Sequence, residues 1–144
     1  MTNALTVKLA FVGAALAASY PFFKRFTHMP QVVLGIAFGW GIPMAFAAET
    51  NSIAAIAWWF LGINTVWSVI YDTLYAMVDR EDDLAVGIKS TAILFGNNDR
   101  LVIGLLQLGF LSLMLVAGIQ FQLGTFYYLG LVGAAFLCVY HQYL

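Results

Sequence analysis

Five long apolar stretches, separated by short polar ones, make up most of this chain. Each stretch is close to the roughly 20 residues that a helix needs to cross the hydrocarbon core of a membrane. Polar turns and prolines mark their ends; Pro21, for example, predicts the end of the first helix, because proline disfavours helical backbone at the residue before it. The predicted membrane helices cover residues 4–20, 31–48, 53–71, 101–119 and 125–141.

The composition supports a membrane protein. Hydrophobic residues make up 62% of the chain and charged residues only 9%, whereas soluble domains carry about 25% charged residues. The net charge of −1, without a basic stripe, argues against a nucleic-acid partner. Residues 4–20 would also fit a secretory signal peptide, but the apolar segments that follow favour a membrane helix. We therefore predict an all-α, multi-pass bundle of about five transmembrane helices in contact with membrane lipid.

Positive charge alternates between the connecting segments. Lys24 and Arg25 follow the first predicted helix, and Arg80, Lys89 and Arg100 follow the third. The connections after the second and fourth helices contain no Lys or Arg. Because cytoplasmic loops are enriched in Lys and Arg, we expect the first and third connections to face the cytoplasm.

The third connection, residues 72–100, carries the candidate chemistry. Residues 71–96 hold five of the seven Asp and Glu residues of the chain. Read as one helix, this stretch places Asp72, Asp79 and Asp83 on one stripe, where carboxylates repel each other unless a cation lies between them. Magnesium is the natural candidate, because it takes oxygen ligands and is commonly shared with a substrate phosphate.

This pattern predicts the handling of a diphosphate at a membrane face. Magnesium would join Asp79 and Asp83 to diphosphate oxygens, and the apolar bundle would hold a lipid chain. Basic side chains would contact the diphosphate directly, and tyrosine rings would stabilise a developing carbocation. The candidates for these direct roles are Lys24, Arg25, Lys89, Tyr71 and Tyr75.

A plainer interpretation of the same residues stays open. An acidic run at a membrane boundary is often only a solvated loop. Lys24 and Arg25 would serve as a topology signal without any role in chemistry. On this interpretation the chain is a non-catalytic membrane protein whose acidic loop binds a divalent cation or a partner.

Two motifs resemble signatures of the UbiA family of membrane prenyltransferases, in its 4-hydroxybenzoate branch. Residues 71–83, YDTLYAMVDREDD, together with residues 87–91, GIKST, resemble the second aspartate-rich motif of that branch. Residues 20–31, YPFFKRFTHMPQ, resemble its YPxxKRxTxxPQ signature. The haem O and menaquinone branches of the family remain alternatives.

The resemblance implies a fold, a reaction and a set of site residues. It implies a bundle of nine helices in the bacterial inner membrane, with its active face toward the cytoplasm. Two aspartate-rich motifs would hold magnesium and a polyprenyl diphosphate, whose prenyl group passes to 4-hydroxybenzoate in ubiquinone biosynthesis. Asp79 and Asp83 match the metal-ligand positions. The other matching motif positions are Asp72, Lys24, Arg25 and Lys89.

One departure concerns the first aspartate-rich motif of the family. No sequence of the NDxxDxxxD type is present, and no Asp precedes Asp72. The resemblance therefore describes residues 1–144 as the C-terminal portion of the family's domain. We expect an N-terminal half outside this sequence to supply the rest of the metal site.

Overall fold

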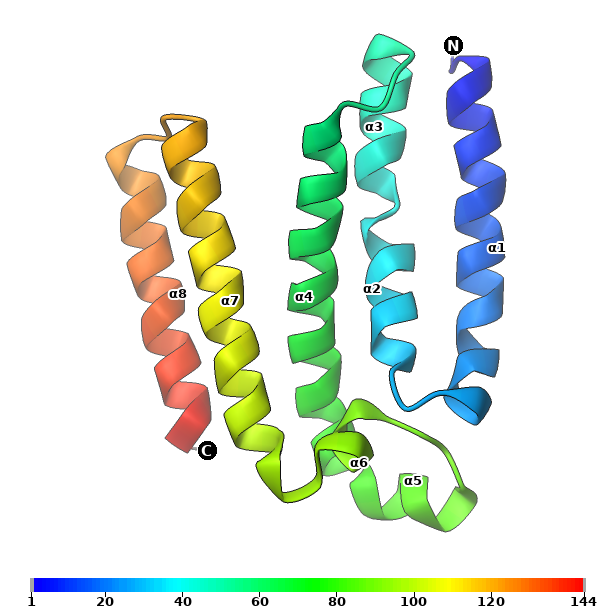
Figure 1. Cartoon of the computed structure of the whole chain (residues 1–144), viewed down its shortest axis with the longest axis vertical. Helices are drawn as coiled ribbons and strands as arrows, with labels where there is room; N and C mark the ends of the chain where they lie inside the picture. The colour runs from blue at the N-terminus through cyan, green and yellow to red at the C-terminus, as the bar shows by residue number, and fades with distance from the viewer. Residues whose placement is uncertain (1, 144) are drawn as a thin grey trace. The chain divides into compact units, whose positions relative to one another are not determined.

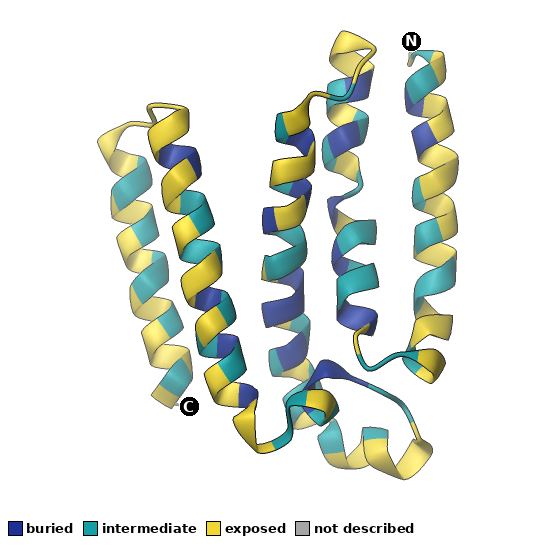
Figure 2. Ribbon diagram, in the orientation of Figure 1, coloured by how far each residue is buried: buried dark blue, intermediate teal, exposed yellow. Residues whose placement is uncertain are grey.

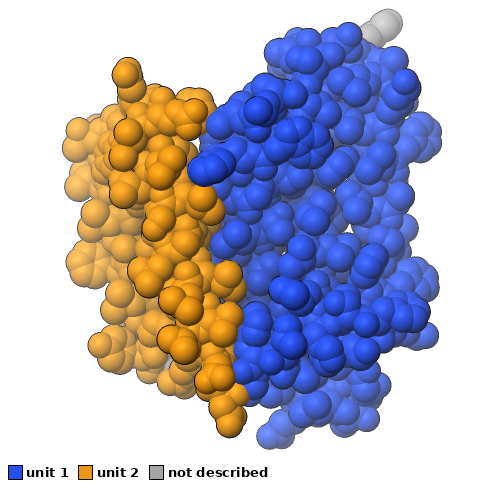
Figure 3. All heavy atoms as spheres, in the orientation of Figure 1, with its two compact units in different colours: residues 1–96 blue, residues 97–144 orange. Residues whose placement is uncertain are grey.

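The computed structural model describes residues 2–143, and these form helices and turns without a strand. This confirms the predicted all-α class. The chain divides into two compact units, residues 1–96 and residues 97–144, which are coloured separately in Figure 3. The candidate site residues all belong to the first unit, and each unit is described here by itself.

The first unit contains two long helices of 23 and 24 residues, two helices of 10 residues each and two shorter ones. The helices α1 and α4 both pack against α2 and α3, which follow one another almost end to end (Figure 1). The short helices α5 and α6 lie at the C-terminal end of α4. The bounds are α1 Ala4–Phe26, α2 Pro30–Gly39, α3 Gly41–Thr50, α4 Ala55–Val78, α5 Arg80–Val86 and α6 Thr91–Phe95.

The second unit is a helical hairpin. The 3₁₀ turn Gly96–Asn98 leads into α7, Asp99–Gln120, which turns back through four residues into α8, Thr125–Tyr143. Near the turn, the Tyr127 hydroxyl donates to the Met114 carbonyl at 2.7 Å. At the open end, the Gln142 amide donates to Gln107 Oε1 at 3.0 Å.

Three helix boundaries differ from those expected from the sequence. The helix α1 does not end at Tyr20 but continues through Pro21 to Phe26, because a helix tolerates one lost backbone hydrogen bond where neighbouring helices support it. The segment 31–48 is broken near Trp40 into α2 and α3, where Pro43 removes a helical donor. The helix α4 ends at Val78 rather than at residue 71, and in the added turns Thr73 is fully buried with its hydroxyl against that of Thr91.

Three segments are long and apolar enough to cross a membrane: Ala4–Phe26, Pro30–Thr50 and Thr91–Gln120. They agree with three of the five predicted spans. Spans formed by α4 and α8 stay a prediction. Exposed residues run along α1 and α8, whereas buried ones gather on α2 and α4 (Figure 2). Many exposed side chains are large and apolar, including Phe11, Phe126 and Phe136, as a lipid-facing surface requires.

Trp40 joins three helices of the first unit at the break between α2 and α3. Its indole Nε1 donates to the Leu9 carbonyl of α1 at 2.9 Å. Its ring lies edge-on to Trp58 of α4, with 6.1 Å between the ring centroids. A Cβ added at Gly13 would lie 2.8 Å from Trp40 Cδ1, so glycine is required for this close approach. The indole therefore fixes α1 against the broken helix pair.

Replacing Trp40 with Phe should keep most of the ring packing but remove the hydrogen bond to Leu9. We expect a loss of about 0.5–1.5 kcal/mol in the free energy of unfolding, read from thermal unfolding in detergent. Trp59→Phe is the matched control, because Trp59 is 39% exposed. Equal destabilisation by both variants would show that the hydrogen bond contributes nothing beyond ring size.

Candidate functional site

The candidate residues meet at one end of the first unit, where α1 ends, α2 begins and α4 ends (Figure 1). The segments that meet there are far apart in sequence. Lys24 lies in the last turn of α1, Gln31 in the first turn of α2, and Asp72 in the last two turns of α4. The fold thus brings both resembling motifs to the same place.

Asp72 is half-buried and lies among groups from three other helices. It follows the predicted membrane segment 53–71. Burial raises the pKa of its carboxyl group; the Lys24 ammonium and a hydrogen bond from Gln31 oppose this shift, and Asp83 adds to it. An ionised Asp72 therefore depends on Lys24 and Gln31 to offset its loss of water.

Lys24 contacts a residue that the sequence analysis did not single out. Its Nζ lies 5.7 Å from the centroid of the Tyr20 ring, one helical turn earlier. Tyr20 also interacts electrostatically with Asp72. The lysine charge is therefore held between a ring and a carboxylate. The i, i+4 spacing of Tyr20 and Lys24 in the sequence could have predicted this contact, because residues at that spacing share a helix face.

Lys89 and Arg25 are placed differently from Lys24. The backbone N–H of Lys89 donates to the Lys24 carbonyl at 3.0 Å, and its Nζ donates to the Phe26 carbonyl at 3.5 Å. Lys89 thus caps the C-terminal end of α1, where carbonyl groups lack helical partners. Arg25 is exposed. A backbone hydrogen bond therefore joins Lys24 and Lys89, whereas the neighbouring Arg25 lies on the surface.

The three aspartates do not lie on one helix, and that expectation was wrong. The helix α4 ends at Val78, and Asp79 adopts the non-helical backbone angles φ −89° and ψ 7° before α5 begins. Asp79 and Asp83 still lie one turn apart, because the Asp83 N–H donates to the Asp79 carbonyl at 2.9 Å. The chain changes direction at Asp79, so the three carboxylates share no single helix face, although Asp83 still interacts electrostatically with Asp72.

The donor set at this turn fits magnesium in number and kind. Asp79 is exposed and Asp83 half-buried, and both offer oxygen ligands. Within residues 2–143, no group of three or more His, Cys, Asp or Glu side chains is gathered to hold a metal. Magnesium suits such a sparse set, because it keeps several waters and binds proteins through one or two carboxylates plus substrate phosphates.

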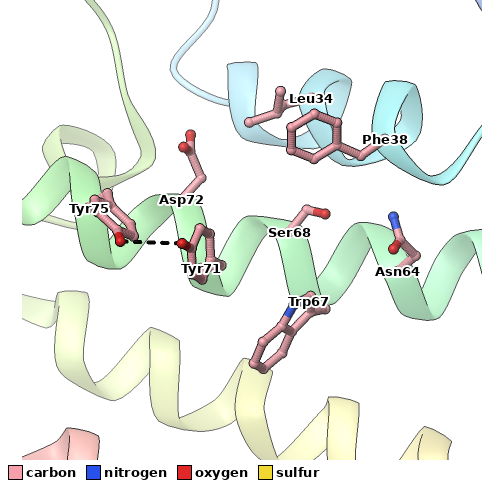
Figure 4. Close-up of a pocket in the computed structure, with 8 residues that line it drawn as sticks. All are labelled: Leu34, Phe38, Asn64, Trp67, Ser68, Tyr71, Asp72 and Tyr75. Carbon is pink, nitrogen blue, oxygen red and sulfur yellow. Dashed lines mark hydrogen bonds between the residues drawn. The ribbon is translucent and has the colours of Figure 1, made fainter.

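A cavity of about 710 Å³ opens beside Asp72, between α2 and α4. Figure 4 shows Leu34 and Phe38 of α2 opposite Ser68 and Asn64 of α4. At the end near Asp72, the Tyr71 hydroxyl donates to the Tyr75 hydroxyl at 3.3 Å. The full lining is Leu34, Phe38, Asn64, Trp67, Ser68, Tyr71, Asp72 and Tyr75. The cavity is mainly apolar with a few polar groups, as small-molecule sites usually are.

The structure adds two polar residues to the site that sequence reasoning had given no role in chemistry. Gln31 is 1% exposed and lies near enough to Asp72 to lower the pKa of its carboxyl group. Asn64 lines the cavity, and its amide donates to the Gly35 carbonyl of α2 at 3.1 Å. Their position within or beside an apolar run could have predicted that they face other helices, because polar residues there rarely face lipid.

Comparison with known proteins gives a family match and several similar relatives. A model of the UbiA prenyltransferase family matches residues 1–144. A 4-hydroxybenzoate octaprenyltransferase of Marinobacter nauticus is 58% identical to this chain over 143 residues. Proteins of the same name from Vibrio atlanticus and Alkalilimnicola ehrlichii are 54% and 56% identical over 142 and 144 residues.

These alignments cover 99–100% of the chain but only 49–50% of each relative. The chain therefore spans about half the length of the curated relatives it matches. No solved structure matches it. Because the family model covers residues 1–144 and the relatives share more than half of the aligned residues, this chain belongs to the UbiA prenyltransferase family.

Proposed function

We propose that this chain supplies part of the active site of a 4-hydroxybenzoate polyprenyltransferase. The observation that carries the proposal is that Asp72 interacts electrostatically with Lys24 and Asp83 at one end of the first unit and also lines a largely apolar cavity. The relatives named above are 4-hydroxybenzoate octaprenyltransferases, which favours this acceptor over those of the haem O and menaquinone branches.

The reaction breaks the bond between the allylic carbon of the donor and its diphosphate oxygen. The diphosphate leaves with the bonding electron pair, a ring carbon of 4-hydroxybenzoate bonds to the allylic carbon, and that ring carbon then loses its proton. Lys24 would attract the diphosphate through its positive charge. Tyr71 and Tyr75 both line the cavity, and the centroids of their rings lie 4.9 Å apart. Their ring faces would attract positive charge on the allylic group.

Asp79 and Asp83 are the residues that would hold magnesium, together with diphosphate oxygens and water. Bound magnesium would neutralise negative charge on the departing diphosphate. The apolar cavity between α2 and α4 would take the part of the prenyl chain next to the reacting carbon. We place this face of the protein at the cytoplasmic side of a bacterial inner membrane, in agreement with the charge of the connections that carry Lys24 and Lys89.

A chimera tests the proposal directly. This chain would replace the matching 143 residues of the Marinobacter nauticus relative. We expect membranes with the chimera to transfer a prenyl group from a polyprenyl diphosphate to labelled 4-hydroxybenzoate, and we expect EDTA to abolish the product until magnesium is restored. The unmodified relative is the control. A folded, membrane-inserted chimera without product, beside an active control, would contradict the proposed function.

A further inference from the structure

The short helix α5 follows Asp79 and carries Asp83, but it adds no residue to the buried core. None of residues 80–86, all of which the structure describes, is buried. Its large apolar side chains Leu84 and Val86 are 60% and 68% exposed. A helix of this length is not stable by itself, because its first turn costs more entropy than one hydrogen bond returns. The position of α5 therefore depends largely on how the chain is attached at its two ends.

The attachment that follows α5 runs from its last turn into the interior of the first unit. The Ile88 N–H donates back to the Asp83 carbonyl at 2.9 Å, and the Lys89 N–H donates to a carbonyl of α1 at 3.0 Å. Ser90 is 3% exposed. Its side chain caps α6 by accepting from the Ile93 N–H at 3.4 Å. The chain thus passes directly from an exposed helix to a buried one.

Thr91, the first residue of α6, is held to two other helices. It is fully buried, and its hydroxyl is hydrogen-bonded to that of Thr73 on α4, which is also fully buried. The Thr91 N–H has no partner within its own helix, because it belongs to the first turn. It donates instead to Oε1 of Gln31 on α2 at 3.3 Å. Breaking such buried hydrogen bonds is costly, because no water replaces the lost partner.

We propose that Thr73 and Thr91 are positioning residues whose buried hydroxyl pair fastens the exposed segment between α4 and α6 to α4. The pair closes residues 73–91 into a loop, and Asp79 and Asp83 both lie inside that loop. A loop that is ordered in advance binds a ligand more tightly, because its entropy has already been lost. Only this consequence for magnesium and prenyl transfer rests on the proposed function.

Thr73→Val and Thr91→Val test the hydroxyl pair, because valine nearly keeps the shape of threonine but lacks the hydroxyl. Each variant leaves one buried hydroxyl without its partner. We expect backbone hydrogen exchange in residues 79–94 of the full chain to become about tenfold faster, while exchange in α7 and α8 stays within about twofold. Mass spectrometry of the protein in detergent measures both. Unchanged exchange in residues 79–94, or equal acceleration throughout the chain, would overturn the inference.

The double variant Thr73→Val/Thr91→Val shows whether the two hydroxyls act on each other. If they do, exchange in residues 79–94 should be no more than about twofold faster than in either single variant, because the second change removes a partner that is already lost. Accelerations that multiply to about 100-fold would show that the hydroxyls act independently, and would overturn the pair.

Two further variants separate the hydroxyl pair from side-chain shape. Thr73→Ser keeps the hydroxyl, so exchange in residues 79–94 should stay within about threefold of that in the unaltered chain. Thr65→Val is the matched control on the same helix, because the Thr65 hydroxyl donates at 2.8 Å to the Leu61 carbonyl within α4. It should leave exchange in residues 79–94 unchanged. Acceleration by Thr65→Val equal to that by Thr73→Val would contradict a specific role for the pair.

Turnover in the chimera supplies the second readout. Thr91→Val should raise the magnesium concentration for half-maximal prenyl transfer about tenfold, because the acidic segment must then be ordered on binding, while KM for 4-hydroxybenzoate stays within about threefold. A loss of turnover with unchanged magnesium dependence would overturn the positioning role. If the chimera has no activity before mutation, the proposed function fails. The exchange result still decides whether the hydroxyl pair holds the segment.

Discussion

Asp79→Ala and Asp83→Ala are each expected to lower turnover of the chimera by about 1,000-fold or more. Either change removes one of the two carboxylates at the turn between α4 and α5. Metal-assisted stabilisation of a departing phosphate contributes several kcal/mol, and each 1.36 kcal/mol corresponds to a tenfold change in rate. The measurement is prenyl transfer as a function of magnesium concentration.

The fold should survive these two substitutions. Asp79 is exposed and Asp83 only half-buried, so little apolar area changes, and we expect the free energy of unfolding to stay within about 1 kcal/mol. Glu81→Ala and Asp82→Ala are the matched controls, because both acids are exposed in the first turn of the same short helix. They carry the same charge change and should keep near-normal turnover.

Two outcomes would separate a metal site from a merely acidic surface. Equal losses from all four alanine variants would mean that the total charge of α5 matters rather than a particular pair. Near-normal turnover of Asp79→Ala or Asp83→Ala would show that the assignment of these residues to magnesium is wrong. In that case the solvated-loop interpretation of the acidic run would be the better one.

Gly35→Ala should disturb the scaffold that holds the cavity. A Cβ at Gly35 would lie 2.9 Å from Thr65 Cα and 3.0 Å from the Thr65 carbonyl oxygen on α4. Because these are backbone atoms, α2 would have to move away from α4. Overpacking of this kind costs about 1–3 kcal/mol of stability. We also expect turnover to fall about 10- to 100-fold, because displacement of α2 carries Gln31 away from Asp72.

Gly62→Ala on α4 is the matched control. A Cβ at Gly62 would meet no atom within 4 Å among the residues that the structure describes. Alanine is a better helix former than glycine, so this variant should gain about 0.5–1 kcal/mol. Thermal unfolding in detergent and prenyl transfer measure both effects. Equal stability of the two variants would show that α2 and α4 tolerate a wider separation than the structure indicates.

Local sequence patterns were sufficient for the helices and for the family. Long apolar runs indicate helices, because a backbone in lipid must satisfy its own hydrogen bonds. The motifs of residues 20–31 and 71–91 indicated the UbiA family, since they are contiguous in sequence. Boundaries were less certain. The continuation of α1 past Pro21 does not follow from local preference, whereas Pro43 does favour the break near Trp40.

The sequence by itself determined the all-α class, the family and the residue types of the site. Only the tertiary structure decided that Asp72 leaves the stripe of Asp79 and Asp83, and that Lys89 caps α1 rather than standing free. Only the packing of α2 against α4 brings Gln31 near Asp72. The reason is physical: periodicity describes one helix at a time, whereas a buried amide takes its partners from whichever segments the packed helices bring within reach.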